Sequence, residues 1–313
     1  MTSTPVISGA KLTPKNKRMR ADFEHRLNRW FQEQANNIGA AIKGKYRPGK
    51  RSTKSMVVSP ALHEWAAKAR KDDSDPEGDD LQTELLVGGK KLPKIQSDMI
   101  RAVALLGWGA INWGALVEIS EPYLEDAGKE GVDVGIGQVQ MLNAGKVREK
   151  ADADAKEYAA ARAAAMAGMK YTADGKLEQD LAARWPLTDV MRRDIESTVA
   201  QAVIEGWTAE QLAAVIEASY SLSAERAEII ADTEITNAQS GGTFSAWRYS
   251  GTITLVRWRT SPIHDLDDEC DDFERQGVVP LGHEFAVGLF SPRAHPHCRC
   301  TLEAVDPDEV FES

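Results

Sequence analysis

Cysteine and histidine gather near the C-terminal end of this chain of 313 residues. Cys298 and Cys300 lie two residues apart, and an extended C-x-C segment turns both sulfurs to the same side. Thiolates beside imidazoles are common ligands of tetrahedral zinc, and Cys270 supplies a third thiol. The spacing therefore predicts a zinc site with three thiol ligands. The fourth ligand could be a carboxylate near Cys270 or one of the histidines His264, His283, His295 and His297.

A second interpretation of the same cysteines needs no metal. The residues over 298–305 alternate as a half-buried strand does, so that Cys298, Cys300, Leu302 and Ala304 share one face. A free cysteine often behaves as a small buried hydrophobic residue. Two hypotheses therefore remain open at this point, in which the cysteines are either metal ligands or members of a core.

Acidic side chains are dense around Cys270. Residues 263–272 contain six carboxylates, and clustered acids can hold Mg²⁺ for phosphodiester cleavage. This allows an alternative function as a metal-dependent nuclease or another enzyme acting on nucleic acid. Its candidate residues are Asp267, Asp268, His264, His283 and His295. Because acidic runs are usually solvated loops and the common catalytic motifs are missing, we expect that the protein is not an enzyme.

Charge is distributed unevenly along the chain. Residues 1–70 hold 15 Lys and Arg against 4 Asp and Glu, whereas the remainder holds 23 against 44. A basic N-terminal arm on an acidic body suits the phosphate backbone of double-stranded DNA or an acidic protein surface. The plain alternative is a solvated basic tail without a partner.

Cysteine number and hydropathy indicate where the chain works. Three cysteines cannot all pair and no secretory leader opens the sequence, so we expect an intracellular, reducing origin. The apolar segment 102–117 is shorter than the roughly 20 residues of a membrane span and contains Asn112 and three glycines. We therefore expect it to be buried in protein or at a partner interface, and we expect no membrane association.

The N-terminal part has the pattern of an arm with short helices. Residues 1–20 are polar and expected to be disordered, and apolar positions at helical spacing predict an amphipathic helix over 21–42. After it we expect a basic loop over 43–59, a short helix over 60–71 and an acidic linker over 72–80.

The central part is less clearly patterned. Residues 93–150 mix helical periodicity with many glycines. The alanine-rich stretch 151–169 favours a helix but offers little bulk to bury, so we expect it to be a connecting helix.

Three further helices are predicted before the last two cysteines. The first covers 187–205, and Thr208 with Gln211 has the spacing of a capping box that starts the second. Ser223 should cap the third, over 224–246. The core candidates of the first helix are Val190, Ile195, Val199 and Val203.

Strand-like segments over 252–260 and 298–305 complete an α+β fold. Its N-terminal and central regions are mostly helical, and a helical segment with a small β-sheet forms a C-terminal module. The predicted domains are a basic arm over 1–80, a central helical region with the connecting helix over 81–184, the module over 185–305 and a tail over 306–313.

One face of the third of these helices carries polar residues at helical spacing. Glu234, Asn237 and Gly241 recur three and four residues apart, and Arg226 precedes them by two turns. This face could dock the strand or a partner, or be the solvated side of the helix. We favour a structural hydrogen-bonding role for Glu234 and Asn237.

The order of these residues resembles the phage Mu F-like minor head protein family, also called a head morphogenesis family. Its pattern runs R-x-x-x-I-A-x-T-E and ends in H-P-x-C-R-C, and the resemblance covers roughly residues 187–304. Phe273 stands where the family often has a second Cys or His, and Asp232 stands where it often has Arg. The matching residues are Arg226, Ile230, Ala231, Thr233, Glu234, Asn237, Ala238, Gly241, Trp247, Gly251, Trp258, Cys270 and the run His295-Pro296-His297-Cys298-Arg299-Cys300.

The resemblance implies a minor capsid protein of a tailed phage. Such a protein acts at the portal vertex during head assembly and DNA packaging or delivery, with the portal and other capsid proteins as partners. It belongs to the virion and, during assembly, to the host cytoplasm. The resemblance also implies that His295 is the zinc ligand beside Cys270, Cys298 and Cys300. It marks Arg226, Thr233, Glu234, Asn237 and Gly241 as a structural motif.

Overall fold

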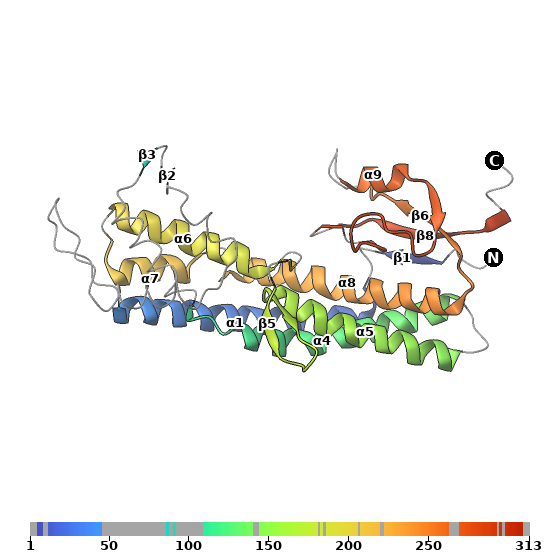
Figure 1. Cartoon of the computed structure of the whole chain (residues 1–313), viewed down its shortest axis with the longest axis horizontal. Helices are drawn as coiled ribbons and strands as arrows, with labels where there is room; N and C mark the ends of the chain where they lie inside the picture. Colours follow the sequence, from blue (N-terminus) through green and yellow to red (C-terminus); the bar gives the residue numbers. More distant parts are fainter. Residues whose placement is uncertain are drawn as a thin grey trace. The chain divides into compact units, whose positions relative to one another are not determined.

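Helices make up most of the described chain and a small antiparallel sheet lies near its C-terminal end, which confirms the predicted α+β class (Figure 1). Contacts divide the chain into a first unit of residues 1–27, 114–184 and 224–313 and a second unit of residues 28–113 and 185–223. The domain boundaries predicted from the sequence remain predictions. The computed structural model describes residues 5–8, 12–45, 86–87, 90–91, 109–139, 144–180, 182–183, 186–205, 207–219, 222–262, 269–292, 294–295 and 298–308.

The second unit contains the part of α1 (Pro14–Lys45) from Asn28 onward, α6 (Leu187–Glu205) and α7 (Ala209–Glu217). The bounds of α6 confirm the helix predicted over 187–205. The predicted capping box is also present, because the Thr208 hydroxyl accepts from the Gln211 amide and the Gln211 side chain accepts from the Thr208 amide. Strands β2 (Leu86–Val87) and β3 (Lys90–Lys91) form a small hairpin.

The core candidates on α6 had different outcomes. Ile195 and Val199 are buried, and Met191 is a buried member that the prediction missed. Val190 is only half-buried, and the side chain of Val203 lies outside the described ones. The predicted short helix over 60–71 and the acidic linker over 72–80 also lie outside the described residues.

The described residues among the first twenty form regular structure that was not expected. Strand β1 (Val6–Ser8) and a helix that begins at Pro14 contradict the expectation of disorder for those positions. The Thr13 hydroxyl accepts from the Asn16 amide at 3.1 Å, as an N-cap residue does, and proline suits the first helical position. The helix predicted over 21–42 therefore lies inside a longer one, which also takes in residues 43–45 of the predicted loop over 43–59.

Helices α4 (Trp113–Val139) and α8 (Ala224–Ser250) approach each other through glycine. A Cβ atom added to Gly242 would lie 1.9 Å from the carbonyl oxygen of Gly128, and one added to Gly131 would lie 2.0 Å from that of Gln239. The Thr243 hydroxyl donates to the Gly131 carbonyl at 2.9 Å. Only glycine permits this backbone-to-backbone contact, because any side chain would separate the helices.

Helix α5 (Ala144–Met166) is packed more closely than a connecting helix would be. Ala151, Ala155, Ala159 and Ala163 recur every fourth residue, and all four are buried. Small side chains had predicted little buried surface for this helix. The correction is that methyl-sized side chains let neighbouring helices come close, so that this face is covered completely.

A hairpin that the sequence analysis did not predict follows α5. Its strands are β4 (Met169–Tyr171) and β5 (Leu177–Gln179). Gly175 supplies the left-handed backbone of the turn, at a φ of 79°.

A four-stranded antiparallel sheet with the order β1-β8-β6-β7 completes the first unit. Strand β6 (Leu255–Arg259) lies within the predicted segment 252–260, and β8 (Thr301–Val305) lies within 298–305. Strand β7 (Val278–Pro280) and helix α9 (Glu269–Arg275) lie between them in sequence. Side chains of α8, α9 and the sheet share one hydrophobic core, which includes Phe244, Trp247, Val256, Trp258, Cys270, Phe273 and Leu302.

Candidate metal centre

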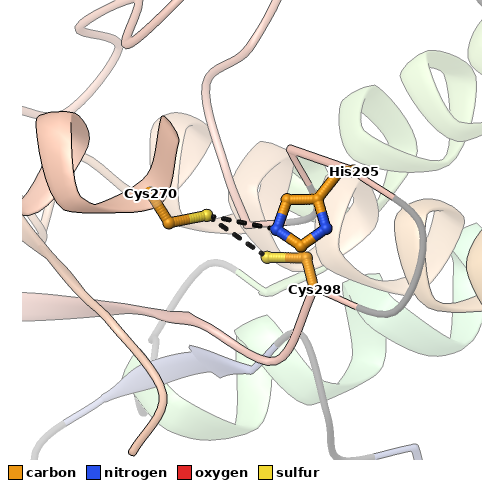
Figure 2. A group of neighbouring side chains, drawn as sticks. All are labelled: Cys270, His295 and Cys298. Atoms are coloured by element: carbon orange, nitrogen blue, oxygen red, sulfur yellow. Dashed lines mark hydrogen bonds between the residues drawn. The ribbon is translucent and has the colours of Figure 1, made fainter. Parts of the chain in front are cut away.

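Two segments of the first unit bring together a thiol and imidazole group. Cys270 lies at the start of α9, and His295 and Cys298 lie in the segment that leads into β8. Figure 2 shows the three side chains pointing toward one another. Their ligand atoms all lie within 4.8 Å of one another, so three of the four predicted zinc ligands are gathered in space.

The spacing of these atoms fits the edges of a zinc tetrahedron. With bonds of about 2.3 Å to sulfur and about 2.0 Å to nitrogen, tetrahedral ligands lie about 3.8 Å apart for two sulfurs and about 3.5 Å apart for sulfur and nitrogen. The Cys270 and Cys298 sulfurs are 3.8 Å apart, and the Cys270 sulfur is 3.5 Å from Nε2 of His295. The residues present therefore fit a tetrahedral metal ion of the zinc type.

The pKa values of the three cysteine thiols are shifted in different directions. Hydrogen bonds with Cys270 and then Cys300 lower the pKa of Cys298 despite its burial. The hydrogen bond with Cys298 raises the pKa of Cys270. For Cys300 the hydrogen bond with Cys270 lowers the pKa, but the one with Cys298 together with burial raises it to about 11. A thiolate stabilised among thiols is the charge pattern that a bound cation would complete.

Cys300 is the one predicted ligand that does not belong to the gathered group. Its sulfur is not among the three that lie within 4.8 Å of one another, although it is close enough to affect the other two thiols. It is fully buried, on the same alternation as Cys298 and Leu302. The core interpretation therefore also holds, because Cys270, Cys298 and Cys300 all belong to the hydrophobic core.

Phe273, which stands where the resembled family often has a second Cys or His, is a core residue. Its ring meets Trp258 edge-on at a centroid distance of 5.1 Å and lies 6.1 Å from Phe285. Phe273 is buried one turn after Cys270 on α9, so it anchors the helix that presents this thiol.

Of the other histidine candidates, His283 is described and is not part of this group. The His283 ring bonds to Oε1 of Gln276 at 2.7 Å, and its ring is edge-on to Phe285. His264, His297, Asp267 and Asp268 lie outside the described residues. Among the described residues, the only group that could hold a metal is therefore Cys270, His295 and Cys298.

The structural motif on α8 divides into buried and half-buried members. Glu234 is buried and accepts two hydrogen bonds from the guanidinium of Arg162, at 2.8 and 2.6 Å. This confirms the structural hydrogen-bonding role expected for Glu234. Arg226 and Thr233 are also buried, whereas Asn237 and Gly241 are half-buried.

Asp232, where the family often has Arg, has a partner in this fold. It accepts from the Arg20 guanidinium at 3.0 Å, so the departure coincides with an ion pair between α8 and α1. Lys15 pairs in the same way with Glu130 of α4 at 3.1 Å. Part of the basic charge of the N-terminal segment is thus neutralised within the first unit.

Two residues and one glycine contact with clear structural roles were not predicted from the sequence. Arg162 had no visible signal, because its partner lies 72 residues away. The Gln138 side chain donates to the Val6 carbonyl of β1 and accepts from the Trp247 indole of α8, and the sequence gives no sign of this. The glycine contact had a signal that could have been used, because Gly128, Gly131 and Gly135 recur on one side of α4 at helical spacing.

No helix among the described residues combines the length and the apolar character needed to cross a membrane. Residues 102–108 of the apolar segment 102–117 lie outside the described residues, and the rest of the segment includes the start of α4 at Trp113.

The fold and the site together define the class of this part of the protein. It is an α-helical unit completed by a small antiparallel sheet, with a group of thiols and an imidazole beside the sheet. Residues 193–303 match the family described as "Phage Mu protein F like protein". The match lies inside the predicted span of 187–304 and confirms the resemblance of this part of the chain to the phage Mu F-like head morphogenesis family. That family is one of structural phage head proteins. No curated protein and no solved structure matched the chain.

We predict that the protein binds about one equivalent of zinc. Cys298→Ser should abolish stoichiometric binding, because it removes one of the three gathered ligand atoms, as measured by elemental analysis after dialysis. Cys300→Ser tests the fourth position and should weaken binding without abolishing it. If the wild-type protein is metal-free and zinc does not change its melting temperature, the cysteines are core residues only.

Proposed function

We propose that this protein is a minor capsid component of a tailed phage that acts at the portal vertex during head assembly and DNA packaging or delivery. The observation that carries the proposal is the family match over residues 193–303, which covers α8, β6, α9, β7 and the three cysteines. The protein would work in the virion and, before completion of the head, in the host cytoplasm.

A scaffolding role agrees with how the motif side chains are used. Glu234 is engaged by Arg162, and the thiols sit in a hydrophobic core. Such groups hold segments together, whereas a catalytic group must be able to reach a substrate. The metal, when bound, would therefore act as a structural cross-link between α9 and the segment before β8.

The basic arm supplies the proposed contact with an acidic portal surface or with packaged double-stranded DNA. Lys15 and Arg20 are engaged in ion pairs, whereas Lys17 and Arg18 are exposed on α1, with no ion pair to a described residue. These two side chains are the described part of the proposed contact. Binding through them should weaken as salt rises, because counterions return to the partner surface.

The direct test is co-purification with the portal protein from assembling heads. A tagged chain should retain portal protein after washing at moderate salt, and the chain should be detectable in procapsids or virions. Absence from both particles would contradict the proposal whatever the state of the metal site.

We predict that Lys17→Glu combined with Arg18→Glu weakens binding to purified portal protein about tenfold or more, with a shallower salt dependence. Lys146→Glu combined with Lys156→Glu, at two exposed positions of α5, changes the net charge equally and is the matched control, which should leave binding unchanged. Titration over a range of salt concentrations measures both quantities. Equal weakening by the control would mean that only net charge matters. If portal binding is unchanged but DNA binding falls, the arm contacts DNA.

A further inference from the structure

The N-terminal strand occupies one edge of the C-terminal sheet. Strand β1 pairs antiparallel with β8, so that Val6, Ile7 and Ser8 stand opposite Glu303, Leu302 and Thr301. The Ala304 amide donates to the Pro5 carbonyl at 3.1 Å. The two paired segments are thus close to opposite ends of the sequence.

A single side chain seats the strand in the core. Ile7 is 2 % exposed and lies among the core residues of the sheet, opposite the fully buried Leu302. Val6 and Ser8 are half-buried on the other face. The edge of β8 therefore offers one buried apolar position, which we call the apolar seat, between two positions where the side chain is only half-buried.

A polar side chain also holds the backbone of β1. Nε2 of Gln138 on α4 donates to the Val6 carbonyl at 2.8 Å. The same amide accepts from the Trp247 indole at 2.9 Å, which holds its orientation. Backbone pairing, an apolar seat and an oriented side-chain donor are the parts of a site that binds an extended strand.

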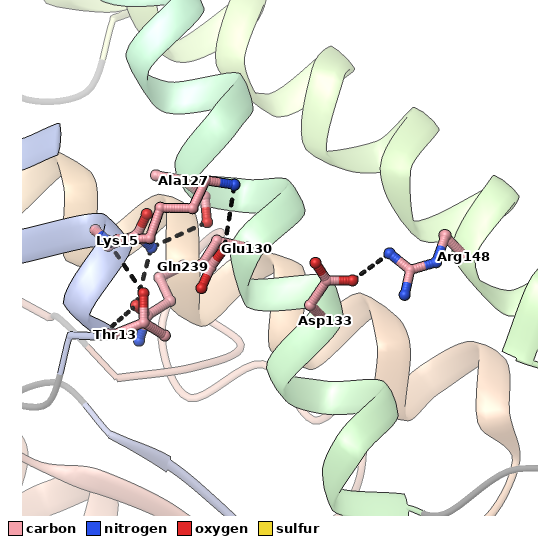
Figure 3. Close-up of polar contacts among 8 residues, drawn as sticks. Thr13, Lys15, Ala127, Glu130, Asp133, Arg148 and Gln239 are labelled. Atoms are coloured by element: carbon pink, nitrogen blue, oxygen red, sulfur yellow. Dashed lines mark hydrogen bonds and ion pairs between the residues drawn. The ribbon is translucent and has the colours of Figure 1, made fainter.

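Helix α1 is held in place without help from β1. Oε1 of Gln239 accepts from the Thr13 amide at 3.1 Å and from the Asn16 side chain at 2.9 Å, and Asn16 also donates to the Ala127 carbonyl (Figure 3). Figure 3 also shows Lys15 paired with Glu130. Departure of the three-residue strand would leave these contacts intact.

We propose that the β8 edge is a strand-acceptor site and that the N-terminal strand is its exchangeable ligand. The strand is supplied by the same chain in this structure, and the site accepts the same segment from a second copy. Release uncovers the β8 edge and frees the end of the basic arm, so strand exchange can link copies of the protein. The inference does not depend on the proposed head function.

The test uses the full chain with a protease site inserted between Gly9 and Ala10. After cleavage of the folded protein, a fluorescent peptide of residues 1–9 should exchange into the site and saturate it. The Ile7→Asp peptide should compete at least about tenfold more weakly, because it loses the buried side chain. The Ser8→Ala peptide is the matched control and should compete normally. Failure of the wild-type peptide to exchange, or unfolding of the cleaved chain, would overturn the proposal.

A second measurement needs no cleavage. In the intact Ile7→Asp chain, hydrogen exchange of the Ala304 amide should accelerate at least about tenfold, because its partner carbonyl on Pro5 departs. Amides of β6 should keep their protection, because the sheet persists without β1. Faster exchange in both strands would show that β1 is an inseparable part of the sheet and would reject an acceptor site.

Discussion

Gly242→Ala is expected to destabilise the first unit by about 3 kcal/mol or more, the upper end of what overpacking costs. The added methyl would lie 1.9 Å from the Gly128 carbonyl oxygen and 3.0 Å from the Val132 amide nitrogen. These are backbone atoms, so no side chain can rotate away and α4 must separate from α8. Urea unfolding should show a lower midpoint with an unchanged slope.

The adjacent glycine is the matched control. Gly241 lies on the same helix, and a Cβ added there would meet nothing within 4 Å. Alanine favours a helix over glycine, so Gly241→Ala should leave stability unchanged or raise it by up to about 1 kcal/mol. Opposite effects at adjacent positions can only come from packing. Similar small effects at both would show that the two helices are not in close contact.

Arg162→Met is expected to cost about 3–5 kcal/mol, because it leaves the Glu234 carboxylate buried without its partner. The side chains of Arg162 and Glu234 are 13 % and 5 % exposed, and two hydrogen bonds join them. The double variant Arg162→Met, Glu234→Met should recover most of the loss, since no uncompensated charge remains. Thermal and urea unfolding of the four proteins complete a double-mutant cycle.

An exposed ion pair in the same unit supplies the comparison. Lys170 and Glu178 face each other across the β4–β5 hairpin at 3.4 Å, and both side chains are at least half exposed. Lys170→Met should change stability by less than about 1 kcal/mol, because water already solvates both charges. If Arg162→Met were equally mild, Glu234 would be reached by water and its structural role would be minor.

Sequence alone determined the features that depend on neighbours within one or two turns. The helix over 187–205 and the box formed by Thr208 and Gln211 were predicted because periodicity and capping involve residues only three or four apart. The alternation that buries Cys298, Cys300 and Leu302 was predicted for the same reason, since successive side chains of an extended segment point to opposite faces.

The Mu F-like resemblance also came from the sequence, because it rests on residue order. It marked Glu234 as part of a structural motif but gave no partner for it. It also pointed to Gly241, whereas the close helix contact is made by its neighbour Gly242. A motif records which residues are present and leaves open what each one touches.

Only the tertiary structure decided the contacts between distant segments. Arg162 meets Glu234 across 72 residues, Thr13 meets Gln239 across 226, and β1 pairs with β8 near the opposite end of the chain. Local pattern cannot encode these pairings, because each depends on how whole helices and strands pack. The thiols follow the same rule: composition named them, but the fold of α9 against the segment before β8 placed Cys270 within 3.8 Å of Cys298.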